Sequence, residues 1–169
     1  MPQYNSCHCM KHVKKSVLLW YSPHEMYALV TGVEHYAEFL PWCERAEVLE
    51  RHEDGMTARL HLAISGVRQS FTTRNTNLPD QRVHMALVDG PFSQLDGVWT
   101  FKPLFKPGGV ALATEGGEAG PQACKIEFGL SYAFSSVALE AVVSPVFDRI
   151  ANTFVDSFVQ RAEAVYGAR

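Results

Sequence analysis

The stretch Tyr36-Ala-Glu-Phe-Leu-Pro-Trp-Cys43 places three aromatic residues, a Leu, a Pro and a Cys within eight positions. It follows a short helical pattern and precedes a long series of strand patterns. Connections of this kind normally run over the protein surface and are polar. We therefore expect this apolar connection to cover something, either the core or the mouth of an apolar cavity.

The residues before this stretch predict a strand and two short helices. Residues 12–20 alternate with the period of a strand. Ser22, Pro23 and Glu25 then form a helix-start signature. Ser22 is the expected N-cap, Pro23 takes the first helical position, and Glu25 completes a capping box. A second short helix is expected over 33–39, and Pro41 ends it.

From residue 46 to residue 134 the pattern changes to a period of two, which predicts strands joined by short turns. One of these strands is expected to turn Val67, Gln69, Phe71 and Thr73 inward. In a later strand, Gly97 either leaves room for a bulky neighbour or marks a bulge. Residues 103–121 contain three Pro and five Gly, and we expect them to form a long connection between the last two strands.

The C-terminal part predicts a long amphipathic helix. Ser136 and Ser144 are both candidate N-caps, and Pro145 suits the first helical position. The apolar stripe of this helix has spacings of three and four residues. It consists of Leu139, Val143, Phe147, Ile150, Phe154 and Phe158.

These elements predict an α+β fold in which a curved antiparallel sheet of about seven strands surrounds one long C-terminal helix. The first strand is expected to pair with the late strands. Two short helices and the 36–43 connection would then cover the open end. Such a sheet and a single helix need not fill the space between them, so an apolar cavity with a gated mouth is expected.

Composition narrows the class of protein. The chain has 169 residues, which fits one domain. A net charge of −3 argues against nucleic acid held mainly by bulk electrostatics, and we expect no DNA partner. No apolar run reaches the roughly 20 residues of a membrane span. With no apparent secretory signal and no disulfide framework among four Cys, we expect a cytoplasmic location.

The N-terminal residues 1–10 are expected to be a flexible extension, and residues 11–167 to form the domain. Cys7-His8-Cys9 invites a zinc interpretation. Structural zinc sites need a second pair of ligands, which the sequence lacks, so we expect no metal site.

Three groups of residues carry a resemblance to a known family. They are Tyr36 with Phe39-Leu40-Pro41-Trp42-Cys43, then Asp89-Gly90-Pro91-Phe92 with Leu95, Gly97, Trp99 and Phe101, and finally Pro145-Val146-Phe147 with Ile150, Ala151 and Phe154. Arg161-Ala162 ahead of Tyr166-Gly167 adds to them. Over residues 11–167 the chain resembles the coenzyme Q-binding and ribosome association toxin (RatA) family. That family belongs to the START-like helix-grip superfamily, which also contains polyketide cyclase-like domains. The resemblance implies the same curved sheet and long helix.

The resemblance implies alternative functions. The first is non-enzymatic binding of ubiquinone or a similar isoprenoid lipid in support of respiratory electron transfer. This function requires no cofactor, and it allows contact with a membrane surface. The second is the role of a toxin, of a toxin–antitoxin pair, that binds the large ribosomal subunit and blocks subunit association and translation. The third, a polyketide cyclase or aromatase-like enzyme, is the least supported. The sequence shows no nucleophile elbow, phosphate loop or convergent carboxylate pair, so no catalytic residue is expected.

The residues expected to line the cavity and its mouth are mostly aromatic. They are Tyr36, Phe39, Leu40, Pro41, Trp42, Phe92, Trp99, Tyr132, Phe147, Ile150 and Phe154. Each could instead be a core residue, since aromatic side chains supply large apolar area in either place. The Tyr132 hydroxyl needs a partner if it is buried, and a quinone carbonyl is one option.

A ribosome-binding protein needs a basic surface, because phosphate contacts dominate RNA affinity. The candidates are Lys11, Lys14, Lys15, Arg68, Arg74 and Arg82. Ordinary charge on strand surfaces explains the same residues.

Overall fold

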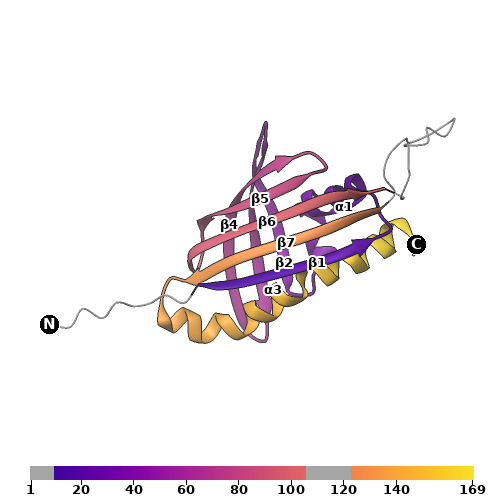
Figure 1. The fold of residues 1–169 in the computed structure, drawn as a ribbon. Coiled ribbons are helices and arrows are strands. Elements are labelled where there is room, and N and C mark those ends of the chain that lie inside the picture. Colours follow the sequence, from indigo (N-terminus) through magenta and orange to yellow (C-terminus); the bar gives the residue numbers. More distant parts are fainter. Residues whose placement is uncertain (1–9, 106–122) are drawn as a thin grey trace.

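The computed structural model describes residues 10–105 and 123–169 (Figure 1). One antiparallel sheet carries seven strands in the order β1-β7-β6-β5-β4-β3-β2. The strands are β1 (Lys11–Leu19), β2 (Cys43–His52), β3 (Gly55–Ile64), β4 (Val67–Leu78), β5 (Arg82–Asp89), β6 (Phe92–Leu104) and β7 (Ala123–Phe134). The α+β fold predicted from the sequence is confirmed.

The first and last strands of the chain are neighbours in the sheet. β1 pairs with β7 from Lys11 opposite Tyr132 to Leu19 opposite Cys124, as the sequence predicts. The other strands form a meander in which each pairs with the next along the chain. At the tight turn between β3 and β4, Ser65 and Gly66 both have positive φ angles, of 50° and 77°. Because β2 pairs only with β3, it forms the edge of the sheet opposite β1.

Three short helical segments and one long helix complete the fold. The segments are α1 (Pro23–Thr31), a 3₁₀ turn η1 (Val33–His35) and α2 (Tyr36–Phe39), and the long helix is α3 (Val137–Tyr166). The predicted capping box is present. The Glu25 amide donates to Ser22 Oγ at 3.1 Å, and the Ser22 amide donates to Glu25 Oε1 at 3.0 Å.

The structure decides between the two candidate starts of the C-terminal helix. Ser136 is the N-cap, and its Oγ accepts from the Leu139 amide at 3.1 Å. Pro145 lies inside α3, where it lacks an N–H for the helical ladder. Ser144 is buried and hydrogen-bonds to Asp148. Figure 1 shows α3 running along the sheet beside β1 and β7.

Two strand boundaries differ from the expectation. β2 begins at Cys43, before the strand pattern expected from residue 46, because the Ala63 amide donates to the Trp42 carbonyl at 2.9 Å and Cys43 pairs with Leu62. β6 extends to Leu104, so residues 103 and 104 belong to a strand and not to the expected 103–121 connection. Pro103 is tolerated there because β6 pairs only with β7 at this point.

The rest of that connection, and the tail with Cys7-His8-Cys9, lie outside the described residues. Within them, none of the helices is both long and apolar enough to cross a membrane. No group of three His, Cys, Asp or Glu side chains in the described ranges is placed to hold a metal ion.

Candidate functional site

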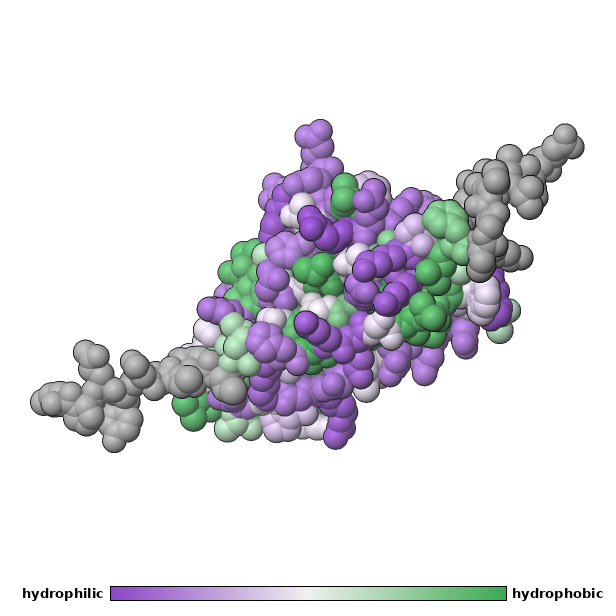
Figure 2. Space-filling model, in the orientation of Figure 1, coloured by the Kyte–Doolittle hydropathy of each residue, from purple (hydrophilic) through white to green (hydrophobic). Residues whose placement is uncertain are grey.

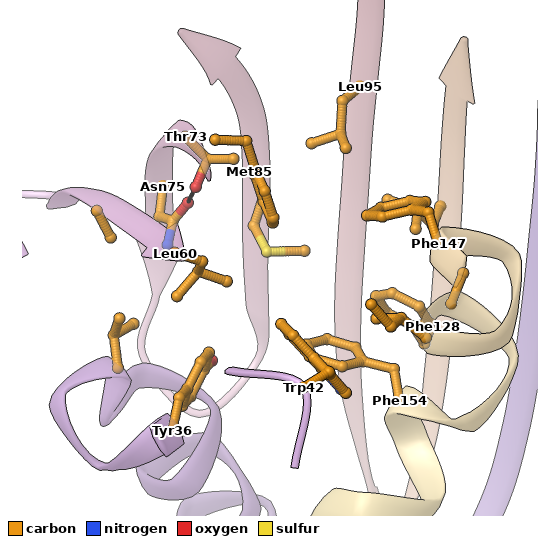
Figure 3. A pocket seen from close by; sticks show the side chains of 16 residues that line it. Tyr36, Trp42, Leu60, Thr73, Asn75, Met85, Leu95, Phe128, Phe147 and Phe154 are labelled. Atoms are coloured by element: carbon orange, nitrogen blue, oxygen red, sulfur yellow. Dashed lines mark hydrogen bonds between the residues drawn. The ribbon is translucent and has the colours of Figure 1, made fainter. Parts of the chain in front are cut away.

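An apolar cavity lies between the sheet and α3 (Figure 3). The empty space in the cavity and its opening is about 630 Å³. The lining residues are Val33, Tyr36, Trp42, Ala58, Leu60, Phe71, Thr73, Asn75, Met85, Leu95, Phe128, Leu130, Phe147, Ile150, Ala151 and Phe154.

The 36–43 connection supplies one part of the wall. Tyr36 and Trp42 are both buried and both line the cavity. The Tyr36 hydroxyl donates to the Val30 carbonyl, and burial raises the pKa of Tyr36, so this group stays a neutral donor. The Trp42 ring lies 5.9 Å from that of Phe154, centroid to centroid. This part of the connection both completes the core and faces the cavity.

The other residues of the connection hold it in place. Phe39 packs edge-on against Phe158 of α3 at 5.1 Å, and the Arg161 guanidinium lies 5.1 Å from the Phe39 ring centre. Leu40 is buried, and its carbonyl accepts from the Cys43 amide at 3.0 Å. Pro41 is exposed at the turn. None of these three predicted residues is in the cavity wall. Phe39 fastens α2 to α3, and Leu40 ties the connection to the start of β2.

Helix α3 supplies the opposite wall. Phe147, Ile150 and Phe154 of the predicted stripe line the cavity. Phe154 lies within 5.9 Å of four aromatic rings, centroid to centroid, those of Trp42, Trp99, Phe128 and Phe158. Five of the eleven predicted site residues therefore face the cavity. Their contact with a ligand stays a prediction.

Phe92 and Trp99 lie in the packed core beside the cavity. The Trp99 side chain is 0% exposed, with its ring 4.7 Å from that of Phe128 and 5.1 Å from that of Phe158. Phe92 is enclosed by Phe147 at 4.8 Å and Phe134 at 5.2 Å. Neither lines the cavity, because other aromatic rings cover them.

Tyr132 belongs to a polar cluster that ties the sheet to α3. Its hydroxyl donates to Asp148 Oδ1 at 2.6 Å, and Lys11 Nζ donates to Asp148 Oδ2 at 2.7 Å. Burial alone would raise the pKa of Asp148, but the bonds from Lys11 and Tyr132 outweigh it and hold the pKa below its usual value. The same burial and carboxylate raise the pKa of Tyr132. The Tyr132 hydroxyl, for which a quinone carbonyl was one expected partner, therefore has a partner within the protein.

Two polar residues of the wall are not among the predicted site residues. Thr73 and Asn75 lie on β4 and face the cavity, on the side away from Phe128 and Phe147 in Figure 3. Thr73 was expected to face inward. The same alternation, extended by two residues, predicts that Asn75 also faces inward. This alternation is the signal in the sequence that identifies Asn75 as a candidate.

Gly97 resolves the choice between a gap and a bulge. A Cβ at this position would lie 2.6 Å from Met85 Cε and 3.3 Å from Leu130 Cδ1. The missing side chain therefore makes room for Met85, which lines the cavity.

The cavity wall offers little for acid–base or nucleophilic chemistry. Among the described residues that line it there is no Asp, Glu, His, Lys, Arg, Ser or Cys. Cys43 lies next to Trp42, but burial raises the pKa of its thiol to about 11, so it is not a thiolate near neutral pH.

The six basic residues considered for a ribosome-binding surface are spread over β1, β4 and β5. Three of them are in ion pairs, Lys11 with Asp148, Arg68 with Glu44 and Arg74 with Asp54. Figure 2 shows a largely hydrophilic face with hydrophobic residues interspersed. These six side chains do not form one uninterrupted basic surface.

Comparisons with known proteins agree with this architecture. Residues 19–159 match the family described as polyketide cyclase / dehydrase and lipid transport. A Pseudomonas aeruginosa protein named ribosome association toxin RatA is 40% identical over 92% of this chain and 98% of its own length. The Xenopus laevis mitochondrial coenzyme Q-binding protein COQ10 homolog B is 28% identical over 90% of this chain and 58% of its own length.

Solved structures show the same fold. The solution structure of an 18 kDa protein from Caulobacter crescentus has a TM-score of 0.65 and 28% identity, covering 94% of this chain and 99% of that one. An aromatase/cyclase from Streptomyces sp. R1128 has a TM-score of 0.68 at 18% identity, covering 92% and 94%. The second likeness shows the fold alone.

Proposed function

The chain belongs to the polyketide cyclase / dehydrase and lipid transport family, and on that premise we propose that it is a non-enzymatic binding protein for an apolar small molecule of the quinone or isoprenoid class. The observation that carries the proposal is the apolar wall of the cavity between the sheet and α3. The relative named as a coenzyme Q-binding protein supports the ligand class.

The wall favours binding over catalysis. A cyclase needs an acid, a base or a polarising group beside its substrate. Here the Tyr36 hydroxyl already donates to a backbone carbonyl, and the Thr73 hydroxyl donates to Asn75. Apolar contact remains as the main attraction. Burying about 200 Å² of apolar ligand surface is worth roughly 5 kcal/mol, before the cost of association is subtracted.

Tryptophan fluorescence tests this proposal. Trp42 lines the cavity, whereas Trp20 is 68% exposed on the surface. A short-chain ubiquinone analogue should quench the emission of the protein in a saturable way. Most of the saturable quenching should disappear in Trp42→Phe and persist in Trp20→Phe. If wild-type emission falls only in proportion to added quinone, without saturation, the proposed function is wrong.

A second candidate function, association with the large ribosomal subunit, is favoured by the relatives named ribosome association toxin. They are 36–40% identical and are matched over 92–99% of their length. As a toxin, the protein would act in the cytoplasm and block subunit joining. The exposed Lys14, Lys15 and Arg82 are available for phosphate contacts.

Sedimentation through sucrose gradients with purified large subunits tests the ribosomal role. The protein should co-sediment at low salt and dissociate as salt rises, because phosphate contacts weaken with ionic strength. Failure to co-sediment at low salt would remove this candidate and leave the cavity proposal unaffected.

A further inference from the structure

Thr73 and Asn75 form a polar pair within an otherwise apolar part of the wall. Their exposed fractions are 6% and 7%. The Thr73 hydroxyl donates to Asn75 Oδ1 at 2.8 Å. Figure 3 shows the two side chains together on β4, with the amide nitrogen of Asn75 turned away from Thr73.

The hydrogen bonds of this pair leave one group without a partner. A primary amide carries two N–H donors on its nitrogen. No acceptor for Asn75 Nδ2 occurs within the residues that the structure describes. Most of the side chains that share the wall with it, among them Leu60, Met85 and Leu95, carry no strong acceptor. Asn75 Nδ2 is not itself sealed from solvent, because it reaches the open space of the cavity. A ligand that fills this space would cut the amide off from water, and a donor left unpaired in that way costs free energy unless the ligand accepts from it.

We propose that Asn75, oriented by Thr73, donates a hydrogen bond from Nδ2 to a neutral acceptor oxygen of the cavity ligand. This inference rests on the proposed function and adds the polarity of the ligand to it. The oxygen would be a carbonyl or an ether on an otherwise apolar molecule. Asn75 is the specificity-determining residue, and Thr73 is a positioning residue that fixes the amide through Oδ1.

The charge of the wall sets the second half of the specificity. Within residues 10–105 and 123–169, the lining contains no Lys, Arg or His to neutralise an anion. Burying a carboxylate or a phosphate without a cation is strongly unfavourable. The site therefore selects a neutral, carbonyl-bearing ligand over a fatty acid or a phospholipid headgroup of similar length.

Three probes with the same alkyl tail separate these contributions. They are a ubiquinone analogue, an alkylbenzene that lacks its oxygens, and a fatty acid of the same carbon number. Wild-type protein should bind the quinone about tenfold more tightly than the alkylbenzene, the ratio expected for one net hydrogen bond. The fatty acid should bind at least tenfold more weakly than the quinone at neutral pH.

Variants on β4 locate the source of the preference. Asn75→Leu should bind the alkylbenzene as well as wild type does and lose the tenfold preference for the quinone. Thr73→Val should retain part of it. Thr76→Val, an exposed site on the other face of the same strand, should change nothing and serves as the matched control.

The side-chain amide resonance of Asn75 in wild-type protein gives a readout that does not depend on any variant folding. It should shift on addition of quinone and stay unchanged with alkylbenzene. Equal wild-type affinity for quinone and alkylbenzene, or an unchanged amide resonance at saturating quinone, would overturn this inference and leave the proposed function standing. Absence of binding by all three probes would instead reject the proposed function.

Discussion

Replacing Gly97 with Ala is expected to push the Met85 side chain into the cavity. The added Cβ would lie 2.6 Å from Met85 Cε, whereas carbon atoms in contact prefer roughly 3.5–4.0 Å. The Met85 methyl must therefore retreat by about 1 Å. Leu130 crowds the same Cβ at 3.3 Å, so the cavity is the available space.

The structure sets the expected size of this effect. Overpacking a core costs roughly 1–3 kcal/mol. We expect about 1 kcal/mol, because the displaced atom ends a flexible side chain. Ala also lowers the entropy of the unfolded chain, which offsets part of this loss. Ligand affinity is the sharper readout. If the cavity loses space for about one methylene group of the ligand, the binding free energy falls by roughly 0.8 kcal/mol. The dissociation constant then rises about fourfold.

Urea unfolding and quinone titration of four proteins test the reasoning. The set is wild type, Gly97→Ala, Met85→Ala and the double variant. The double variant should bind the quinone about as tightly as Met85→Ala alone, because the side chain that the added methyl group would displace has been shortened. If Gly97→Ala binds like wild type, or if the fourfold loss persists in the double variant, Met85 is not the group that carries the effect.

Three further changes probe other parts of the molecule. Phe154→Ala should lower the free energy of unfolding by about 3–5 kcal/mol, because it removes a ring packed against four others; a loss under 1 kcal/mol in urea unfolding would contradict this. Trp42→Ala should cost about 3 kcal/mol, since one side of the ring already faces empty space, and should also weaken quinone binding in a titration. The pKa of Asp148 is lowered in the folded state, where the carboxylate pairs with Lys11. This ion pair therefore stabilises the protein fully above a pH of about 4, which is the ordinary pKa of an Asp carboxyl group. The stabilisation is lost as the pH falls through the lower pKa of the folded state. Urea unfolding of Asp148→Asn and wild type should therefore differ most near neutral pH, and a difference that grows on acidification would refute the assignment.

Sequence periodicity predicted those features that depend on local geometry. Alternate residues of a strand face the same side whatever surrounds them, so the period of two predicted over residues 46–134 reappears as the alternating burial of β7. The capping box at Ser22 and Glu25 was equally local. The start of α3 could not be predicted from local sequence, because Ser144, followed by Pro145, has the residue types typical of an N-cap and the first helical position. Its side chain instead joins Asp148 and, through it, β1, a contact between residues more than 130 positions apart.

The site was harder to predict because core and cavity residues both face inward. Phe147 and Phe154 line the cavity, whereas Trp99 and Phe92 face the same interior and are covered by other rings. Which of them meets empty space depends on the curvature of the sheet and on the position of α3, and neither is encoded in the spacing. Asn75 was missed because the inward alternation was followed only as far as residue 73.

The most direct test of a cavity-bound ligand is a set of NMR spectra of the protein titrated with a short-chain ubiquinone analogue. Methyl resonances of Ala58, Leu60 and Met85, which line the cavity, should shift and show contacts to the ring protons of the quinone. Those of the exposed Leu18 and Val142 should not change. Unchanged cavity methyls at saturating quinone, or shifts confined to the surface methyls, would contradict the account.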